Sequence, residues 1–131
     1  MADKKTILAV DDEQIALLVL QKCLVPRFNL VVAKSAAEAL NQLNSAVPDL
    51  ILLDIEMDGI SGFEFLHTIR KTPKCMSLPV IIVTGHDEPG FAERSKSAGA
   101  ADVVLKPVAA DSLIEKIEQV LKQPRQNPFG L

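Results

Sequence analysis

The stretch Ile7-Leu8-Ala9-Val10-Asp11-Asp12 places four apolar residues directly before two aspartates. Short apolar runs return along the chain at 30–33, 50–53, 80–83 and 103–105, and polar residues follow each of them. Runs this short and continuous are typical of strands buried on both faces of a parallel sheet. The sequence therefore predicts five parallel strands.

The segments between the runs carry the period of amphipathic helices. In the first helix, the stripe that we expect to face the core is Ala16, Val19, Leu20, Cys23 and Leu24. The second segment begins with the capping box Ser35-Ala36-Ala37-Glu38, and further helices are expected over 62–71, 91–98 and 110–122. Five strands each followed by a helix predict an α/β fold, a (βα)₅ doubly wound parallel sheet with the flavodoxin-like strand order 2-1-3-4-5.

The composition is that of one globular domain. The 131 residues are 48% hydrophobic and 24% charged, and 14 Lys and Arg against 17 Asp and Glu give a net charge of −3. This slight acidic excess argues against nucleic-acid binding by this chain, because neutralising phosphates requires clustered cations. No apolar run approaches the roughly 20 residues of a membrane helix, and the first run is too short for a signal peptide. We therefore expect a cytoplasmic protein without membrane insertion, and Cys23 and Cys75 are expected to be free thiols.

Chemically active side chains follow the predicted strands at the edge where open parallel sheets bind ligands. They are Asp11 and Asp12 after the first run, Asp54 after the third, Thr84 after the fourth and Lys106 after the fifth. Any one of them alone would be an ordinary turn or cap residue. The first and third strands are neighbours in the expected order, so three carboxylates would meet in one cleft, where without a cation they would repel and hold protons. A hard divalent cation such as Mg²⁺ resolves this repulsion.

This pattern resembles the receiver domain of two-component response regulators, of the chemotaxis type in which the receiver stands alone. The motifs that carry the resemblance are Val10-Asp11-Asp12, Leu53-Asp54, Met57-Asp58-Gly59-Ile60-Ser61-Gly62, Val83-Thr84-Gly85 and Leu105-Lys106-Pro107. The resemblance runs from about Thr6 to Lys122, which implies a receiver domain over 1–122 and a flexible C-terminal tail over 123–131. No effector fits in such a tail, so output is expected through another protein or a part of the chain beyond this sequence.

The resemblance implies a role for each motif residue. Asp54 would be the phosphoacceptor, which attacks a phosphohistidine on a sensor histidine kinase or a histidine phosphotransfer protein. Asp12 would bind Mg²⁺ directly and Asp11 mainly through water, with Asp54 and the backbone carbonyl of Glu56 completing the protein ligands. Lys106 would pair with the phosphoryl oxygens.

Thr84 would bond the phosphoryl group once it arrives and so report its presence. The phosphorylated state would shift the population of loop arrangements and alter binding to a downstream effector protein. On this interpretation the chain is a signalling module that catalyses its own phosphorylation and slow dephosphorylation, rather than an enzyme acting on other substrates.

Three positions depart from the family pattern. Val103 stands where most relatives carry an aromatic residue that swings inward when the threonine moves, so the aromatic half of the switch is missing or replaced. Asp58 stands where proline is frequent, and it adds an acid near the metal. Ala109 replaces the usual Ser or Thr cap, so the start of the last helix is expected to fray.

Two loop residues border the predicted phosphoryl position. Glu56 lies two residues after Asp54, and His86 lies two residues after Thr84. One interpretation is that they set the hydrolysis rate of the aspartyl phosphate, and the other is that they are two solvated loop side chains.

An apolar patch is expected beside the acidic cleft. Ile15 and Leu18 lie outside the predicted buried stripe, and Pro107 and Val108 should border the same cleft. Such a patch suits docking of a helical phosphotransfer partner. The alternative is a crowded helix with some extra exposed apolar residues.

Other functions compete with this interpretation. An aspartyl-nucleophile phosphatase usually has a second Asp two residues after the nucleophile, where this chain has Glu56. A flavin or nucleotide carrier is disfavoured because no phosphate-binding glycine loop follows a strand, and the chain has no Trp or Tyr. A receiver-like docking module cut from a larger regulator or hybrid kinase, which never accepts phosphate, would not need the complete acidic set and Lys106.

Overall fold

The computed structural model of the chain describes residues 4–57, 59, 61–85 and 87–125. Its strands are β1 (Thr6–Val10), β2 (Asn29–Ala33), β3 (Leu50–Leu53), β4 (Val80–Thr84) and β5 (Asp102–Leu105). Its helices are α1 (Gln14–Leu24), α2 (Ala36–Ser45), α3 (Gly62–Arg70), α4 (Phe91–Ser97) and α5 (Ala110–Lys122). All strand pairs are parallel and the order is β2-β1-β3-β4-β5, which confirms the predicted fold class and topology.

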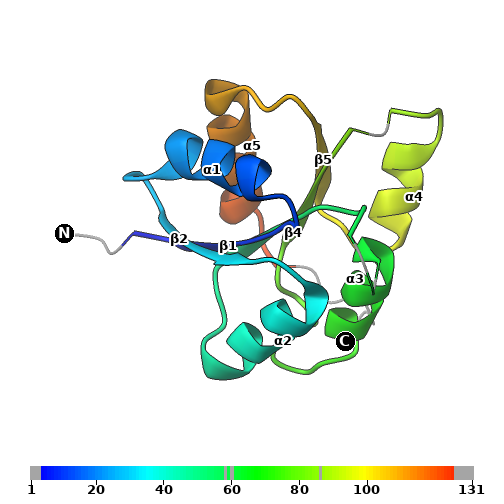
Figure 1. The fold of residues 1–131 in the computed structure, drawn as a ribbon. Helices are drawn as coiled ribbons and strands as arrows, with labels where there is room; N and C mark the ends of the chain where they lie inside the picture. Colours follow the sequence, from blue (N-terminus) through cyan, green and yellow to red (C-terminus); the bar gives the residue numbers. More distant parts are fainter. Residues whose placement is uncertain (1–3, 58, 60, 86, 126–131) are drawn as a thin grey trace.

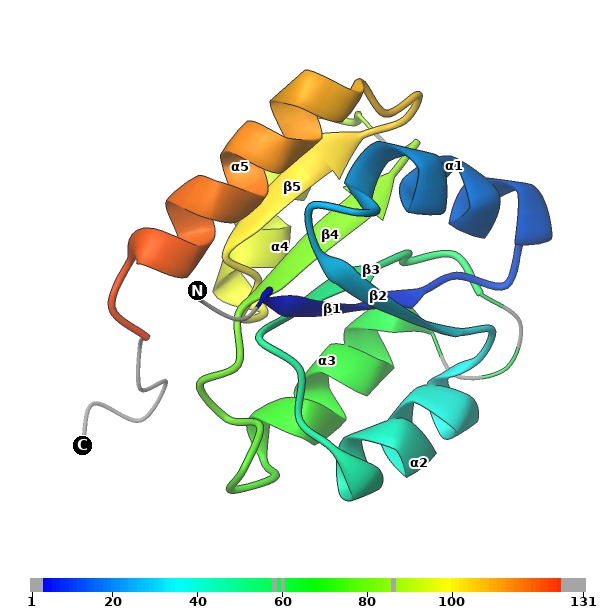
Figure 2. The same ribbon diagram turned by 90° about the vertical axis from the view of Figure 1, so that its left-hand side faces the viewer.

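The helices cover both faces of the sheet (Figures 1 and 2). One core cluster joins α1 and α5 to the sheet, and the other joins α2, α3 and the start of α4 to its opposite face. Successive residues of β1, β3 and β4 alternate between the two clusters, as side chains of a strand must. This alternation explains why the three central runs are apolar at every position.

The two edge strands differ from the prediction of burial on both faces. In β2 only Ala33 is buried, while Val31 and Val32 are exposed. In β5 no residue is fully buried, and Leu105 is exposed. An edge strand lacks a neighbour on one side and is less covered by helices, so an apolar run alone does not distinguish it from a central strand.

The buried face of α1 also differs from the predicted stripe. Leu17, Leu20 and Leu24 are buried, whereas Val19 is 41% exposed. The helix is apolar almost throughout its first two turns, so the sequence pattern did not determine which side faces the sheet. Leu17 is therefore a core residue.

Serine side chains fix the starts of two helices on the other face. Ser35 Oγ accepts a hydrogen bond from the Glu38 N–H (3.1 Å), and Ser61 Oγ accepts one from the Glu64 N–H (3.2 Å). The Ser35 bond is the serine half of the capping box predicted before α2. Helix α5 begins after Ala109 without a side-chain cap, as the sequence predicts. The longest helix, α5, has 13 residues, and no helix within the described ranges has the length and apolarity needed to span a membrane.

Candidate divalent-cation site at the carboxyl edge of the sheet

The neighbouring strands β1 and β3 place two aspartates side by side. Val10 pairs with Leu53 in the sheet register, and the Asp54 N–H donates to the Val10 carbonyl (2.9 Å). Asp11 and Asp54 follow these residues directly, and both are at least 95% buried. The register of the sheet therefore brings together two carboxylates that lie 43 positions apart.

Asp12 joins them to form a group of three acids. One carboxylate oxygen from each of Asp11, Asp12 and Asp54 lies within 4.8 Å of the others. Oxygen ligands at this density suit a hard divalent cation such as Mg²⁺. The three residues predicted as carboxylate ligands thus lie together in one cluster.

Burial and like charge disfavour ionisation of Asp54. Desolvation by burial and the neighbouring Asp11 carboxylate raise the pKa of Asp54 from 3.8 to about 6, although Lys106 and the Glu56 N–H act in the opposite direction. The Glu56 N–H donates to Asp54 Oδ1 (3.3 Å). A carboxyl held in this way becomes a fully ionised nucleophile more readily when further positive charge is added.

Lys106 extends from the end of β5 into the acidic cluster. Its Nζ donates to Asp11 Oδ2 (3.1 Å) and lies 3.9 Å from Asp54 Oδ1. Burial acts to lower the pKa of Lys106, but the hydrogen bond and charge of Asp11, together with Asp54 and Glu13, outweigh it and raise this pKa. The ammonium therefore remains charged across the neutral range.

Thr84 ends β4 between the acids and the lysine strand. It is fully buried, it pairs with Leu105 in the sheet register, and its carbonyl accepts the Lys106 N–H (2.8 Å). The predicted active residues of strands β1, β3, β4 and β5 thus all lie at one edge of the sheet.

Two contacts at this edge were not anticipated from the sequence. The Glu13 N–H donates to Asp11 Oδ1 (3.0 Å), which fixes the rotamer of that carboxylate. An Asp side chain often accepts a hydrogen bond from the backbone N–H two residues later, in an Asx-turn, so Asp11 at this position could have indicated the contact.

The second contact is that of Gly62 with the backbone that carries Asp54. The Gly62 N–H donates to the Ile55 carbonyl (3.0 Å), and a Cβ at Gly62 would lie only 2.6 Å from Ile55 Cα and 2.7 Å from the Asp54 carbonyl oxygen. The start of α3 can approach the segment after β3 this closely only because residue 62 has no side chain.

The other predicted residues lie around this edge. The Glu56 residue is exposed, and Val103 is half-buried against the core on the α2–α4 side. His86 and Asp58 lie outside the described residues.

The predicted docking residues are unequal in exposure. Ile15 is 76% exposed and Leu18 is 48% exposed, and Pro107 is exposed as well. Val108 is half-buried and packs against the α1–α5 core cluster. Ile15, Leu18 and Pro107 therefore supply most of the apolar surface that this set offers.

Fold and site together define a flavodoxin-like α/β domain with an acidic cluster, in which Asp11 and Asp54 are buried, and a lysine at its ligand-binding edge. Residues 7–118 match the family model described as the response regulator receiver domain. The chain therefore belongs to the response regulator receiver domain family, the receivers of two-component systems.

Relatives and solved structures agree with this assignment. The chain is 32% identical over 123 residues to the phosphate regulon transcriptional regulatory protein PhoB of Escherichia coli, covering 91% of this chain and 52% of that protein. It is 33% identical over 126 residues to a probable cyclic di-GMP phosphodiesterase of Vibrio cholerae, covering 96% of this chain and 29% of that protein. The chain thus spans about half or less of the length of these relatives.

The fold matches solved response regulator structures over nearly their whole length. A putative response regulator from Chloroflexus aurantiacus superposes with a TM-score of 0.87 at 26% identity, covering 92% of this chain and 100% of the other. The chemotaxis protein CheY4 of Vibrio cholerae superposes with a TM-score of 0.84 at 25% identity, covering 90% and 99%. Receiver domains are signalling modules that work with histidine kinases and effectors, and this chain is such a module.

Proposed function

We propose that Asp54 is the phosphoacceptor of this receiver domain and takes a phosphoryl group from a phosphohistidine. The observation that carries the proposal is the position of the Asp54 carboxylate, which is buried beside Asp11 and 3.9 Å from the Lys106 ammonium. In the step, Asp54 Oδ forms a bond to phosphorus while the P–N bond breaks, and the imidazole leaves with the bonding electron pair and becomes neutral after proton uptake. The product is an aspartyl phosphate.

The site residues divide the work of positioning and charge neutralisation. Asp11, Asp12, Asp54 and the Glu56 carbonyl are the groups that would hold Mg²⁺, which when bound neutralises carboxylate and phosphoryl charge. The Lys106 ammonium exchanges its pairing with the two carboxylates for pairing with phosphoryl oxygens. The Thr84 hydroxyl donates a hydrogen bond to the arriving phosphoryl group, and the β4–α4 loop moves with Thr84.

The donor is a sensor histidine kinase or a histidine phosphotransfer protein in the cytoplasm, and the phosphorylated form binds a downstream effector. The exposed Ile15 and Leu18 beside the acidic edge support docking of a helical donor, with Pro107 and part of Val108 at its border. Glu56 and His86 control access of water to the phosphoryl group and so its lifetime. The proposed receiver unit is residues 1–122, followed by 123–131 as a tail, of which 126–131 lie outside the described residues.

Phosphorylation by a small donor tests the acceptor directly. With Mg²⁺ and a small phosphodonor such as acetyl phosphate, mass spectrometry should show one added phosphoryl group, which Asp54→Asn should abolish. Asp111→Asn removes an exposed carboxylate at the start of α5 and should keep full labelling. Labelling that survives in Asp54→Asn would disprove the assignment of the acceptor.

A second comparison tests the docking residues. Ile15→Asp should slow transfer from a phosphohistidine donor by about tenfold, equivalent to about 1.4 kcal/mol, and should leave labelling by the small donor unchanged. Val47→Asp changes a 40%-exposed apolar residue after α2 and serves as the matched control. Equal transfer rates in the two variants would contradict the docking role.

A further inference from the structure

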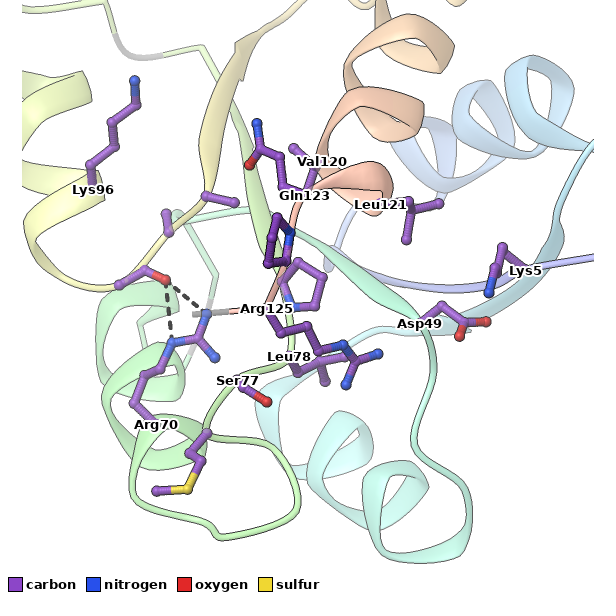
Figure 3. A pocket seen from close by; sticks show the side chains of 16 residues that line it. Lys5, Asp49, Arg70, Ser77, Leu78, Lys96, Val120, Leu121, Gln123 and Arg125 are labelled. Carbon is purple, nitrogen blue, oxygen red and sulfur yellow. Dashed lines mark hydrogen bonds between the residues drawn. The ribbon is translucent and has the colours of Figure 1, made fainter. Parts of the chain in front are cut away.

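A second polar site lies at the amino ends of the strands, opposite the acidic cluster. There a cavity of about 440 Å³ opens between the loop after α3, the turn before β5 and the segment after α5 (Figure 3). Its apolar lining comes from Met76, Leu78, Pro79, Val120 and Leu121. Figure 2 shows the start of β1 and the end of α5 on this same side of the molecule.

The charge of this cavity is opposite to that of the whole chain. Lys5, Arg70, Lys96 and Arg125 line it, against the single carboxylate of Asp49. Four cations against one carboxylate leave a local excess of three positive charges in a chain whose net charge is −3. Asp49 is also engaged, because its Oδ2 accepts a hydrogen bond from the Thr6 N–H (2.8 Å).

Arg70 is held in the cavity wall by three hydrogen bonds. Its Nε and Nη2 donate to the Gly99 carbonyl (3.2 and 2.7 Å), and its Nη1 donates to the Cys75 carbonyl (3.1 Å). Both acceptor carbonyls are neutral, and within 4–57, 59, 61–85 and 87–125 no carboxylate forms an ion pair with this guanidinium. Burial lowers the pKa of Arg70. A half-buried cation held only by carbonyl groups gains free energy when an anion comes beside it.

The other cations line the cavity in an open arrangement. Figure 3 shows Arg70 on α3 and Arg125 on the segment after α5 on two sides of the cavity, with Lys5 and Lys96 farther out in opposite directions. Two guanidinium groups in one cavity suit phosphate oxygens, which they can bind through pairs of N–H groups. The apolar lining suits the organic part of a ligand.

We propose that this cavity binds a small organic phosphate. The ligand would place its phosphate near Arg70 and Arg125 and its organic part against Leu78 and Val120. Binding would join the end of α3 to the segment that follows α5, so it would regulate the module from the edge opposite Asp54. The site does not depend on phosphorylation of Asp54.

The test is a titration followed by amide and arginine Nε chemical shifts. It is done in EDTA, where the acidic edge repels anions, and it uses pyrophosphate, AMP and uncharged adenosine as probes. AMP and pyrophosphate should give saturating shifts at Gly99, Ala100, Ala101 and the Arg70 Nε, and adenosine should give none. Arg125→Gln should raise the Kd for AMP at least about tenfold.

Two further variants distinguish specific binding in the cavity from non-specific electrostatic attraction of the anion. Arg70→Lys keeps the charge but loses the planar donor set, and it should also raise the Kd about tenfold. Arg27→Gln removes an exposed arginine that pairs with Glu118 and does not line the cavity, so it should leave the Kd within about twofold. If Arg70→Lys unfolds, Arg125→Gln still decides the outcome, since Arg125 is exposed.

Three results would overturn the proposal. One is a set of shifts that stay linear in AMP concentration, and another is equal binding of adenosine and AMP. The third is equal weakening by Arg125→Gln and Arg27→Gln, which would reduce the effect to non-specific electrostatics.

Discussion

Lys106 Nζ lies 3.1 Å from Asp11 Oδ2, so the strand at one edge of the sheet supplies the cation for an acid on a strand three positions away. The same ammonium is 3.9 Å from Asp54 Oδ1. Among the described residues, Lys106 is the cation paired with the buried carboxylates of Asp11 and Asp54. Its removal leaves the repulsion between these two carboxylates uncompensated.

We therefore predict that Lys106→Gln destabilises the metal-free protein at pH 8 by about 1–3 kcal/mol, since breaking a buried pair leaves the partner charges unpaired. Urea unfolding in EDTA measures the change. Lys116→Gln is the matched control, because Lys116 forms a half-exposed pair with Asp102 (3.3 Å) that should contribute less than about 1 kcal/mol. Equal losses in the two variants would show that the acidic cluster does not need Lys106.

The raised pKa of Asp54 predicts a stability that depends on pH. Burial and the charge of Asp11 raise this pKa from 3.8 to about 6, so between these values the folded protein binds more protons than the unfolded protein. Stability therefore falls as the pH rises through this window, by at most about 3 kcal/mol, and remains reduced above it.

Asp54→Asn removes this loss, so the variant should be more stable than the parent at pH 7.5 and gain much less at pH 4. The measurement is urea unfolding in EDTA at the two pH values, with Asp111→Asn as a control whose difference from the parent stays nearly constant. Saturating Mg²⁺ should stabilise the parent more than Asp54→Asn. A stability difference between Asp54→Asn and the parent that does not change with pH would contradict the assigned cause.

The sequence was sufficient for the topology and for the carboxylate cluster, because strand order follows from connection rules and the acids directly follow the runs. It was not sufficient for the phase of α1, where Val19 and Leu17 are equally apolar and only packing decides which is buried. Nor did it indicate the exposure of Val31, which depends on the number of neighbouring strands. The contact of Gly62 with the Asp54 backbone depends on the angle at which α3 approaches the sheet, which no local pattern encodes.

That contact predicts a strong effect of a single methyl group. Gly62→Ala would place Cβ 2.6 Å from Ile55 Cα, so the backbone must move, at a cost of about 1–3 kcal/mol. The measurement is thermal or urea unfolding. Gly85→Ala is the control, because a Cβ there meets nothing within 4 Å and should change stability by less than about 0.5 kcal/mol. If both variants were equally stable, the close approach of α3 to the acceptor strand would be absent in solution.

Position 103 is a valine, but Phe63 and Phe91 form an aromatic pair between α3 and α4. The ring centroids of Phe63 and Phe91 are 5.9 Å apart in an edge-to-face arrangement, and the Arg94 guanidinium lies 5.2 and 5.4 Å from them. Phe63 follows Gly62 on α3, and Phe91 begins α4 after the loop from Thr84. The pair therefore connects the segment that follows Asp54 with the segment that follows Thr84.

We predict that phosphorylation changes the packing of this aromatic pair. The chain contains no Trp, so Phe63→Trp adds a single fluorophore at the half-buried position of the pair. Its emission should change on addition of Mg²⁺ and a small phosphodonor, because movement of the loop after Thr84 shifts Phe91 against the new ring. The same substitution combined with Asp54→Asn should give no change, and Val47→Trp should report none in either background. An emission that responds equally in the Asp54→Asn background would separate the aromatic pair from the phosphoacceptor and disprove this coupling.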